Sequence, residues 1–489
     1  MYNSIQQFMG SGIGEIGNII KEFTVNQEQS IGDLIKGLNK PMNELICNIV
    51  SEVLEEIDNI YRESEDRKGD YVIERSNVSN SFVSTVGQIR YERTYFKDRE
   101  TGKCKYLVDE ACGITKNMRK SEDVVIESLN HVIDSSYRIS GEHATKTEDI
   151  ISKQAVMKDI HELEIPSYIP IVKTKRQCKV LYINADEDHV SLQFNKVKGD
   201  LQYSNGRKSN TLESRLAYVY EGIYTESTNS KRNKLLNSHY FTNTNKVNDS
   251  LFEEIVTYID AVYDDKYLEK IYLMGDGAAW IKSGLDVLGA KSVFVLDKFH
   301  LNQSIMRAIG HLGDSINDTK DAIYEAIQEE EIDEIKEIFS FASELALTDS
   351  KIEQIKRTRR YILNHWESII LPNTDSYART SCSAEGHVSH MLSSRLSSRP
   401  LGWSVKGASN VAKLRVYVAN GGKVVDILRY KKDKIKRERK QEVIDEFDRR
   451  IRVKRKTYTD VWNTQALPTR IGKVDGMYTL FKSFRGFCG

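Results

Sequence analysis

Three acidic residues in this sequence stand where carboxylates could work as a set. Asp186 follows the apolar run VLYINA, Asp276 follows KIYLMG, and Glu385 lies within SCSAEGHVSHMLSSRL. Attack on a phosphodiester requires a strong nucleophile and relief of charge in the transition state, and two divalent cations about 4 Å apart supply both. Mg²⁺ prefers oxygen ligands. The pattern therefore predicts a site for two Mg²⁺ ions, or Mn²⁺ in their place, held by these three side chains.

Each of these acids also has an ordinary structural interpretation. A single Asp after a strand more often caps a turn than binds a metal. Asp188 lies on the same short stretch as Asp186 and competes with it as the first ligand. Asp297 and His300, in VLDKFH, have the spacing of a strand-to-helix corner, where they would either support the site or cap the next helix.

The segments around these acids predict a sheet that would bring them together. Apolar runs predict five strands, and amphipathic periodicity predicts helices between the later ones. The order β-β-β-α-β-α-β is that of an RNase H-like fold, in which the first and fourth strands are neighbours. Gly275 and Gly277 flank Asp276 and would let the backbone turn sharply there. The predicted strands are CKVLYINAD, HVSLQF, LAYVYEGIY, IYLMGDGA and KSVFVLDKFH.

The rest of the chain predicts a multidomain protein of mixed α+β and α/β class, since 489 residues exceed one ordinary core. Short helices, a polar break and a second helix opened by Ser152 are typical of a helix-turn-helix, although any helical bundle would give the same pattern. Pro166 and Pro170 mark a linker. The expected regions are helical 1–66, a small β-rich region with a hairpin 67–118, helix-turn-helix-like 119–165, an RNase H-like catalytic domain 171–300 and 373–410, an all-helical insertion 301–372, and a basic C-terminal region 411–489.

Composition sets limits on location and partners. Lys and Arg together equal Asp and Glu, at 71 each, so a nucleic-acid partner must be argued from local charge. The six cysteines include no C-x-x-C pair, which disfavours a zinc ribbon and suits a reducing cytosol. No segment has the roughly 18 apolar residues of a membrane helix. We expect a cytoplasmic protein without a membrane partner.

Local charge does indicate DNA contact. Residues 429–456 contain 14 Lys or Arg and 6 Asp or Glu, and such a segment binds phosphates without reading sequence. A basic helix is also commonly just a solvated surface. Near Glu385, SSRLSSRPLGWS offers arginines for a DNA end and a tryptophan that would stack on a base or belong to the core. The predicted DNA-contact residues are Arg395, Arg399, Trp403, Lys431, Lys432, Lys434, Lys436 and Arg437.

Four stretches resemble one family. YINADEDHVSLQ, GDGAAWI, VLDKFHL and CSAEGHVSHMLSSRLSSRPLGWS are similar to segments of the bacterial ISLre2 transposases, also called UPF0236 proteins, which are relatives of the Mutator-like and IS256-like DDE enzymes. The resemblance covers about residues 70 to 410. It implies that Asp186, Asp276 and Glu385 are the metal-binding triad and that Asp297 and His300 form the D-x-x-H motif of those relatives.

The expected activity is transposition. Metal-activated water would cut the element ends, and the freed 3′-hydroxyl would attack target DNA. The expected partners are double-stranded DNA, as terminal inverted repeats and as target, and a second copy of the chain, because two ends must be processed together in a homodimer or larger assembly. Two alternatives remain: another RNase H-like nuclease such as a junction resolvase, and an inactive, transposase-derived DNA-binding protein.

Overall fold

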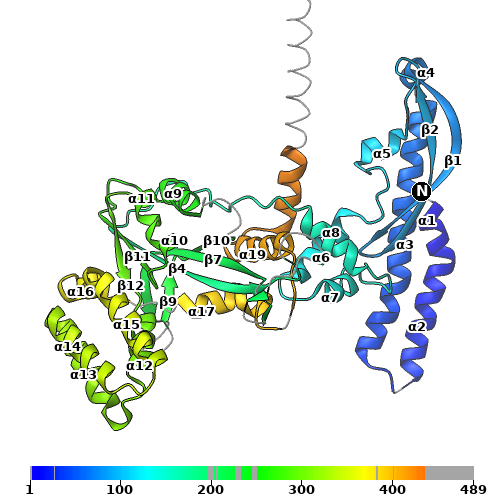
Figure 1. Cartoon of the computed structure of the whole chain (residues 1–489). Helices are drawn as coiled ribbons and strands as arrows, with labels where there is room; N and C mark the ends of the chain where they lie inside the picture. Colours follow the sequence, from blue (N-terminus) through cyan, green and yellow to red (C-terminus); the bar gives the residue numbers. More distant parts are fainter. Residues whose placement is uncertain are drawn as a thin grey trace, which may run out of the picture. The chain divides into compact units, whose positions relative to one another are not determined.

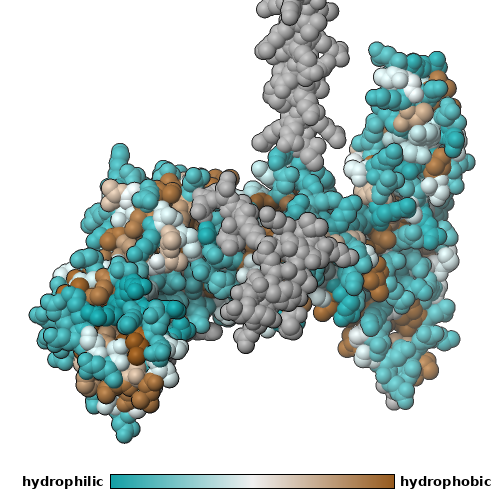
Figure 2. All heavy atoms as spheres, viewed as in Figure 1, coloured by the Kyte–Doolittle hydropathy of each residue, from teal (hydrophilic) through white to brown (hydrophobic). Residues whose placement is uncertain are grey.

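The structure is a computed structural model that describes residues 3–26, 28–194, 203–204, 207–208, 210–225, 233–244, 251–380, 384–399 and 401–434. The chain forms two compact units, Met1–Ile427 and Leu428–Gly489. Within the second unit, residues 428–434 are helical. No helix in these described ranges is both long enough and apolar enough to cross a membrane. The face drawn in Figure 2 is mostly hydrophilic, with hydrophobic residues in small separate groups.

The N-terminal region begins with helices, as predicted for residues 1–66. The longest is α3, Ile31–Glu63, which starts at a capping box formed by Ser30 and Asp33. One face of α3 packs on the hairpin that follows, where Asp58 accepts hydrogen bonds from the backbone N–H and the hydroxyl of Thr94. The other helices here are α1 Asn3–Gln7, a π-helix Phe8–Gly12, α2 Ile13–Val25 and α4 Glu65–Asp70.

A three-stranded antiparallel sheet follows, within the region 67–118 that was predicted to be β-rich with a hairpin. Strand β1, Tyr71–Ser84, pairs with β2, Gly87–Asp98, and β2 pairs with the short β3, Cys104–Lys105. Arg93 and the Tyr91 hydroxyl both contact the buried carboxylate of Asp109, on helix α5, Leu107–Cys112. This ion pair ties α5 to the sheet.

Three short helices occupy the segment predicted to be a helix-turn-helix. They are α6 Glu122–Val132, α7 Tyr137–Glu142 and α8 Lys153–His161. Ser152 caps α8 by accepting a hydrogen bond from the backbone N–H of Ala155, so the predicted helix start is confirmed. A role for these helices in DNA recognition remains a prediction.

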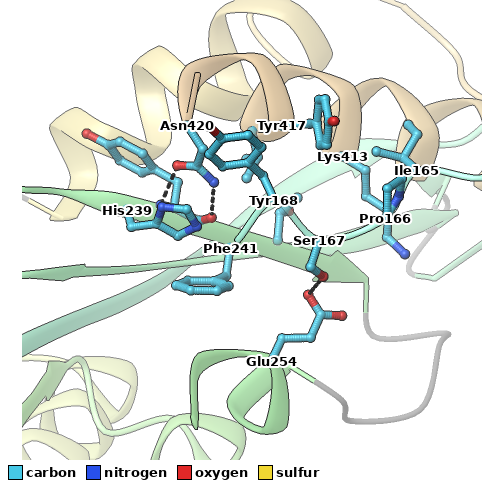
Figure 3. A pocket seen from close by; sticks show the side chains of 13 residues that line it. Ile165, Pro166, Ser167, Tyr168, His239, Phe241, Glu254, Lys413, Tyr417 and Asn420 are labelled. Carbon is cyan, nitrogen blue, oxygen red and sulfur yellow. Dashed lines mark hydrogen bonds between the residues drawn. The ribbon is translucent and has the colours of Figure 1, made fainter. Parts of the chain in front are cut away.

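The linker after α8 lies against the main sheet. Ser167 donates a hydrogen bond of 2.7 Å to Glu254, and the Tyr168 ring stacks on His239 (Figure 3). Burial lowers the pKa of His239 to about 4. The side-chain amide of Asn420 accepts from the backbone N–H of Tyr240 and donates to its carbonyl, both at 2.8 Å. Asn420 thus satisfies backbone groups of an edge strand that would otherwise be open to another chain.

The main sheet has five strands in the order β10-β7-β4-β11-β12 (Figure 1). Strands β7 and β10 run antiparallel to their neighbours, whereas β11 and β12 are parallel to β4. The topology is therefore mixed, within a mixed α/β chain. The bounds are β4 Val180–Ser191, β7 Thr211–Tyr220, β10 His239–Thr244, β11 Lys270–Gly275 and β12 Ser292–Leu296.

Two of the strand predictions were wrong. HVSLQF is not a separate strand, because β4 continues through Asp186 to Ser191 while pairing with β7. In chain order, the third strand of the sheet is β10, which the sequence did not predict. The predicted strand LAYVYEGIY is divided between β7 and β8, Gly222–Thr225. Strand β8 pairs with β9, Asn233–Leu236, in a two-stranded hairpin of its own.

Helices cover both faces of the sheet. Leu181 and Ile183 of β4 join a core cluster with α9, Leu251–Val262, and with the later helices. The opposite face carries a row of stacked tyrosines from four strands, against which His387 of α17 packs. The remaining helices are α10 Ala279–Lys282, α11 Gly284–Leu288, α12 Lys298–Ile309, α13 Ile316–Gln328, α14 Ile332–Glu344, α15 Asp349–Asn364, α16 Trp366–Thr374, α17 Ala384–Val388, a π-helix Ser389–Ser393, α18 Ser394–Leu396 and α19 Val405–Ala419.

Candidate active site

Strand register brings the first two predicted carboxylates to the same edge of the sheet. Asn184 of β4 pairs with Met274 of β11, so Asp186 and Asp276 each lie two residues beyond a paired position. Gly275 pairs with Leu296 of β12, which puts Asp297 beside Asp276 in the same way. Side chains two residues apart on a strand share a face. Three aspartates from neighbouring parallel strands therefore meet where β11 and β12 end.

The two glycines around Asp276 are both needed for this geometry. Gly277 has φ +89°, which L side chains rarely adopt, and a Cβ there would lie 2.3 Å from His365 Nε2. A Cβ on Gly275 would lie 2.9 Å from the Ala185 carbonyl oxygen. The Asp276 carboxylate accepts a 2.8 Å hydrogen bond from the backbone N–H of Ala278, which fixes its direction.

Burial and neighbouring charges perturb the first aspartate. Burial raises the pKa of Asp186 to about 6; a hydrogen bond from the backbone N–H of Glu187 and the charge of His300 oppose the rise, whereas Asp276 adds to it. The pKa of His300 is raised, chiefly by its hydrogen bond to Asp297 and also by the charges of Asp186 and Asp276. His300 is bonded to Asp297, and its positive form offsets part of the charge of the aspartates.

Asp297 caps the next helix, as one of the two interpretations of the sequence predicts, and it also holds His300. One carboxylate oxygen caps α12 by accepting from the backbone N–H of Phe299 at 3.2 Å. The other oxygen pairs with His300 Nδ1 at 2.8 Å. Because both oxygens are engaged, Asp297 holds the histidine and the start of the helix in place beside Asp186 and Asp276.

The two acids that follow Asp186 on β4 have other partners. Glu187 accepts a hydrogen bond from the indole N–H of Trp280. Asp188 accepts a 2.9 Å hydrogen bond from the Ser397 hydroxyl. The register sets Asp186, and not Asp188, level with Asp276. The geometry therefore favours Asp186 as the first member of the pair.

Glu385 is exposed in the first turn of α17, a helix that packs against β4. Over the residues that the structure describes, no three His, Cys, Asp or Glu side chains form a group that could hold a metal ion. The carboxylate oxygens of Asp186 and Asp276 suit a hard divalent cation, but Glu385 does not join them in a metal-binding group among these residues. Glu385 as a ligand remains a prediction.

The interpretation of Arg395 and Trp403 as DNA-contact residues is not supported by their surroundings. They are only 7% and 6% exposed, and the Arg395 guanidinium lies 4.7 Å from the centre of the Trp403 ring. Arg395 donates to the Val132 carbonyl, and the Trp403 indole N–H donates to the Leu396 carbonyl at 2.9 Å. Their polar groups hold α18 and the following segment to α6, so Trp403 belongs to the core.

The other predicted DNA-contact residues lie on the exposed surface, on the helical residues of the second unit, or outside the described residues. Arg399 is exposed. Lys431, Lys432 and Lys434 lie on the helical residues of the second unit. Lys436 and Arg437 lie outside the described residues. DNA contact by these six side chains remains a prediction.

Sequence reasoning missed two residues that support the site from the helical region. The Tyr361 hydroxyl, on α15, donates a 2.7 Å hydrogen bond to the backbone carbonyl of Asp276. Burial raises the pKa of Tyr361, and the charges of Asp276 and Asp297 add to the rise. His365 packs against Gly277. Its ring nitrogen Nε2 is buried and has no hydrogen-bond partner among the residues that the structure describes. Neither residue has a local motif, since Tyr361 is 85 positions from Asp276.

Comparison with known proteins identifies the family. The model described as "Uncharacterised protein family (UPF0236)" matches residues 25–433. This chain belongs to the UPF0236 family. A UPF0236 protein of Caldanaerobacter subterraneus subsp. tengcongensis is 35% identical over 476 residues, which is 96% of this chain and 95% of that one. A UPF0236 protein of Streptococcus gallolyticus, encoded in a vanSb 3′ region, is 24% identical over 428 residues, covering 84% of this chain and 86% of the relative.

The UPF0236 membership confirms the family indicated by the four sequence stretches. Among solved structures, this UPF0236 protein is similar to a chain of the Drosophila P element transposase strand transfer complex, with 10% identity, covering 67% of this chain and 84% of that chain. The TM-score is 0.21, which is too low to support an argument.

Proposed function

We propose that this UPF0236 protein is a DNA transposase of the DDE type, which cuts the ends of its element and joins the freed 3′-hydroxyls to target DNA. The observation that carries the proposal is the register of β4 and β11, which makes Asp186 and Asp276 neighbours. The strand order β10-β7-β4-β11-β12, with three antiparallel strands followed by two parallel ones, supports an RNase H-like catalytic domain.

The proposed ligands are Asp186, Asp276 and Glu385. Divalent cations bound there, two Mg²⁺ or Mn²⁺, would activate the attacking oxygen and stabilise the leaving one. Asp276 is aimed by the Ala278 N–H and by the Tyr361 hydrogen bond to its backbone. For Glu385 to complete the set, α17 must bring its first turn to the aspartate pair.

The residues around the pair would prepare it for this role. Partial burial of Asp186 keeps competing water away and strengthens electrostatic interactions with a bound cation. His300, held through Nδ1 by Asp297, offsets carboxylate repulsion in the metal-free protein. The helical residues 301–372 would form an insertion in this domain, and 119–165 and the basic 411–489 would contact the terminal repeats and target DNA. We expect a dimer or larger assembly on DNA, in the cytoplasm.

A strand-transfer assay tests the proposal directly. The substrate is a labelled duplex carrying the end of the element that encodes the chain, incubated with a target plasmid and Mg²⁺. We expect cleaved and joined products from the wild type. Asp276→Ala should lose cleavage by several orders of magnitude while DNA binding is retained, because the change removes a ligand and no DNA contact. Asp286→Ala, an exposed aspartate on the nearby α11, is the matched control and should remain active.

The same assay separates the rivals. Cuts without joined products would indicate a resolvase-like nuclease. A mobility shift without any cleavage would indicate a DNA-binding protein descended from a transposase. Cleavage by Asp276→Ala at the wild-type rate would refute the assignment of this site.

A further inference from the structure

A cleft of about 750 Å³ lies beside the aspartate edge, and the proposed chemistry does not use it. One wall is the β8–β9 hairpin, another is the first turn of α12, and α17 contributes a third side. Cavities of roughly 300 to 1,000 Å³ are typical of small-molecule and cofactor sites. The side chains that matter to its chemistry are Lys234, Tyr240, Asp297, Lys298, Phe299 and His387.

Phe299 is an aromatic residue that lines the cleft and remains exposed to solvent. Its side chain is 47% exposed, although it is large and apolar. The backbone beneath it is fixed, because the Phe299 N–H donates to Asp297, the residue that caps α12. The ring meets that of His300 edge to face, with centroids 5.4 Å apart and planes at 86°. A single exposed Phe is common on protein surfaces; this one is held on the wall of a cleft next to candidate catalytic residues.

The charges around Phe299 suit an anion. Lys298 is exposed and adjacent to it, and Lys234 lines the cleft from strand β9. The acid in this wall, Asp297, is already paired with His300. Two further lining residues, Tyr240 and His387, are joined by a 3.0 Å hydrogen bond. The cleft therefore combines a cationic rim with aromatic surfaces, which are the two features that recognise the phosphate and the base of a nucleotide.

We propose that this cleft binds one unpaired nucleotide of the DNA substrate, with its base stacked on Phe299 and its phosphate held by Lys298. The inference rests on the proposed function, since it takes DNA as the ligand. A base within a duplex has both faces covered by its neighbours, so the nucleotide must leave the stack to reach the ring. The cleft would hold a DNA end in place beside Asp186 and Asp276 without reading its sequence.

Binding of a short single strand tests the proposal without any need for cleavage. The full-length protein, in EDTA and at a moderate salt concentration that weakens phosphate binding but leaves it measurable, is titrated into a labelled oligothymidylate of about eight nucleotides. Phe299→Ala should weaken binding by about 5- to 150-fold, the range for losing one base–aromatic stack. Phe299→Trp should restore the affinity. Phe341→Ala, an exposed phenylalanine on α14 that is 58% accessible, is the matched control and should bind like the wild type.

An abasic strand of equal length provides the decisive comparison. It keeps the phosphates and lacks the bases, so Phe299→Ala should bind it as tightly as the wild type does, whereas Lys298→Ala should weaken binding of both strands. Equal binding of oligothymidylate by Phe299→Ala and the wild type would overturn the proposal. So would an equal loss on the abasic strand, because that result indicates damage to the fold or a contact of Phe299 with the sugar-phosphate backbone.

These outcomes are separable from those of the proposed function. If Asp276→Ala abolishes cleavage but Phe299→Ala has no effect on the single strand, the transposase assignment stands and the cleft proposal fails. If the wild type never cuts DNA but Phe299→Ala still loses base-dependent binding, the cleft remains a nucleotide site and the transposase assignment fails.

Discussion

Replacing Asp186 with Asn should stabilise the metal-free protein at neutral pH. Burial raises the pKa of this carboxyl from its ordinary value of 3.8 to about 6. The folded state at neutral pH therefore carries a charge that its surroundings disfavour. Asn has the same shape and no charge, and its side-chain oxygen can still accept the hydrogen bond from the Glu187 N–H.

The pKa shift sets both the size and the pH window of the effect. Because the folded pKa lies above the unfolded one, the folded state binds more protons between the two values, and stability falls as pH rises from about 4 to about 6. At about 1.4 kcal/mol for each pH unit, the loss reaches about 3 kcal/mol above pH 6. Asp186→Asn removes this penalty, so its advantage should be close to 3 kcal/mol at about pH 7.5 and near zero at about pH 4.

Urea unfolding in EDTA measures this difference. Wild type, Asp186→Asn and the control Asp321→Asn, an exposed aspartate on α13, are compared at both pH values. The control should match the wild type within about 0.5 kcal/mol. Added Mg²⁺ should stabilise the wild type more than Asp186→Asn, because the variant has lost a proposed ligand. An advantage of Asp186→Asn that is equal at both pH values, or absent at both, would refute the reasoning.

Three other substitutions test separate parts of the structure. Gly277→Ala should lower the free energy of unfolding by several kcal/mol and impair cleavage, because a Cβ at this positive φ would meet His365 Nε2. Its control is Gly17→Ala, in open space within α2, which should be neutral or stabilise the protein by up to about 1 kcal/mol in thermal unfolding. Trp403→Ala should lower the free energy of unfolding by about 3–5 kcal/mol, and DNA affinity of the folded fraction, measured by mobility shift, should be unchanged. Asp109→Ala should cost about 3–5 kcal/mol in urea unfolding by leaving the mostly buried guanidinium of Arg93 unpaired. A loss no larger than that of a typical surface substitution would count against that ion pair.

The sequence predicted the parts of the sheet that have a strong local pattern. Strands β11 and β12 and helix α9 correspond to uninterrupted apolar or amphipathic runs, and each was located. The long β4 was divided because Asp186, Glu187 and Asp188 have low β propensity and resemble a loop. Pairing with β7 along their whole length overrides that preference, which no local pattern could reveal.

The short β10 was missed for a related reason. Its sequence, HYFTNT, contains few aliphatic residues, and its stability comes from pairing with β7 and from the Asn420 amide, which lies 180 residues away. Arg395 was misinterpreted because an arginine in a serine-rich segment normally indicates a surface. Its burial depends on the Val132 carbonyl and the Trp403 ring, contacts that become visible only in three dimensions.

The candidate site likewise contains residues that a local sequence pattern predicts and residues that only the folded structure reveals. Asp186 and Asp276 could be paired from sequence because each follows a strand and the strand order implied that the two are neighbours. The residues that hold them could not, since Tyr361 and His365 belong to the helical region between Asp276 and Glu385. That region is therefore more than a spacer: Tyr361 is bonded to the backbone of Asp276, and His365 fills the space that Gly277 leaves. A displacement of α15 would move the Tyr361 hydroxyl and, through its hydrogen bond, the backbone of Asp276, the same residue whose carboxylate belongs to the pair. The position of the helical region and the geometry of the aspartate pair therefore cannot vary independently.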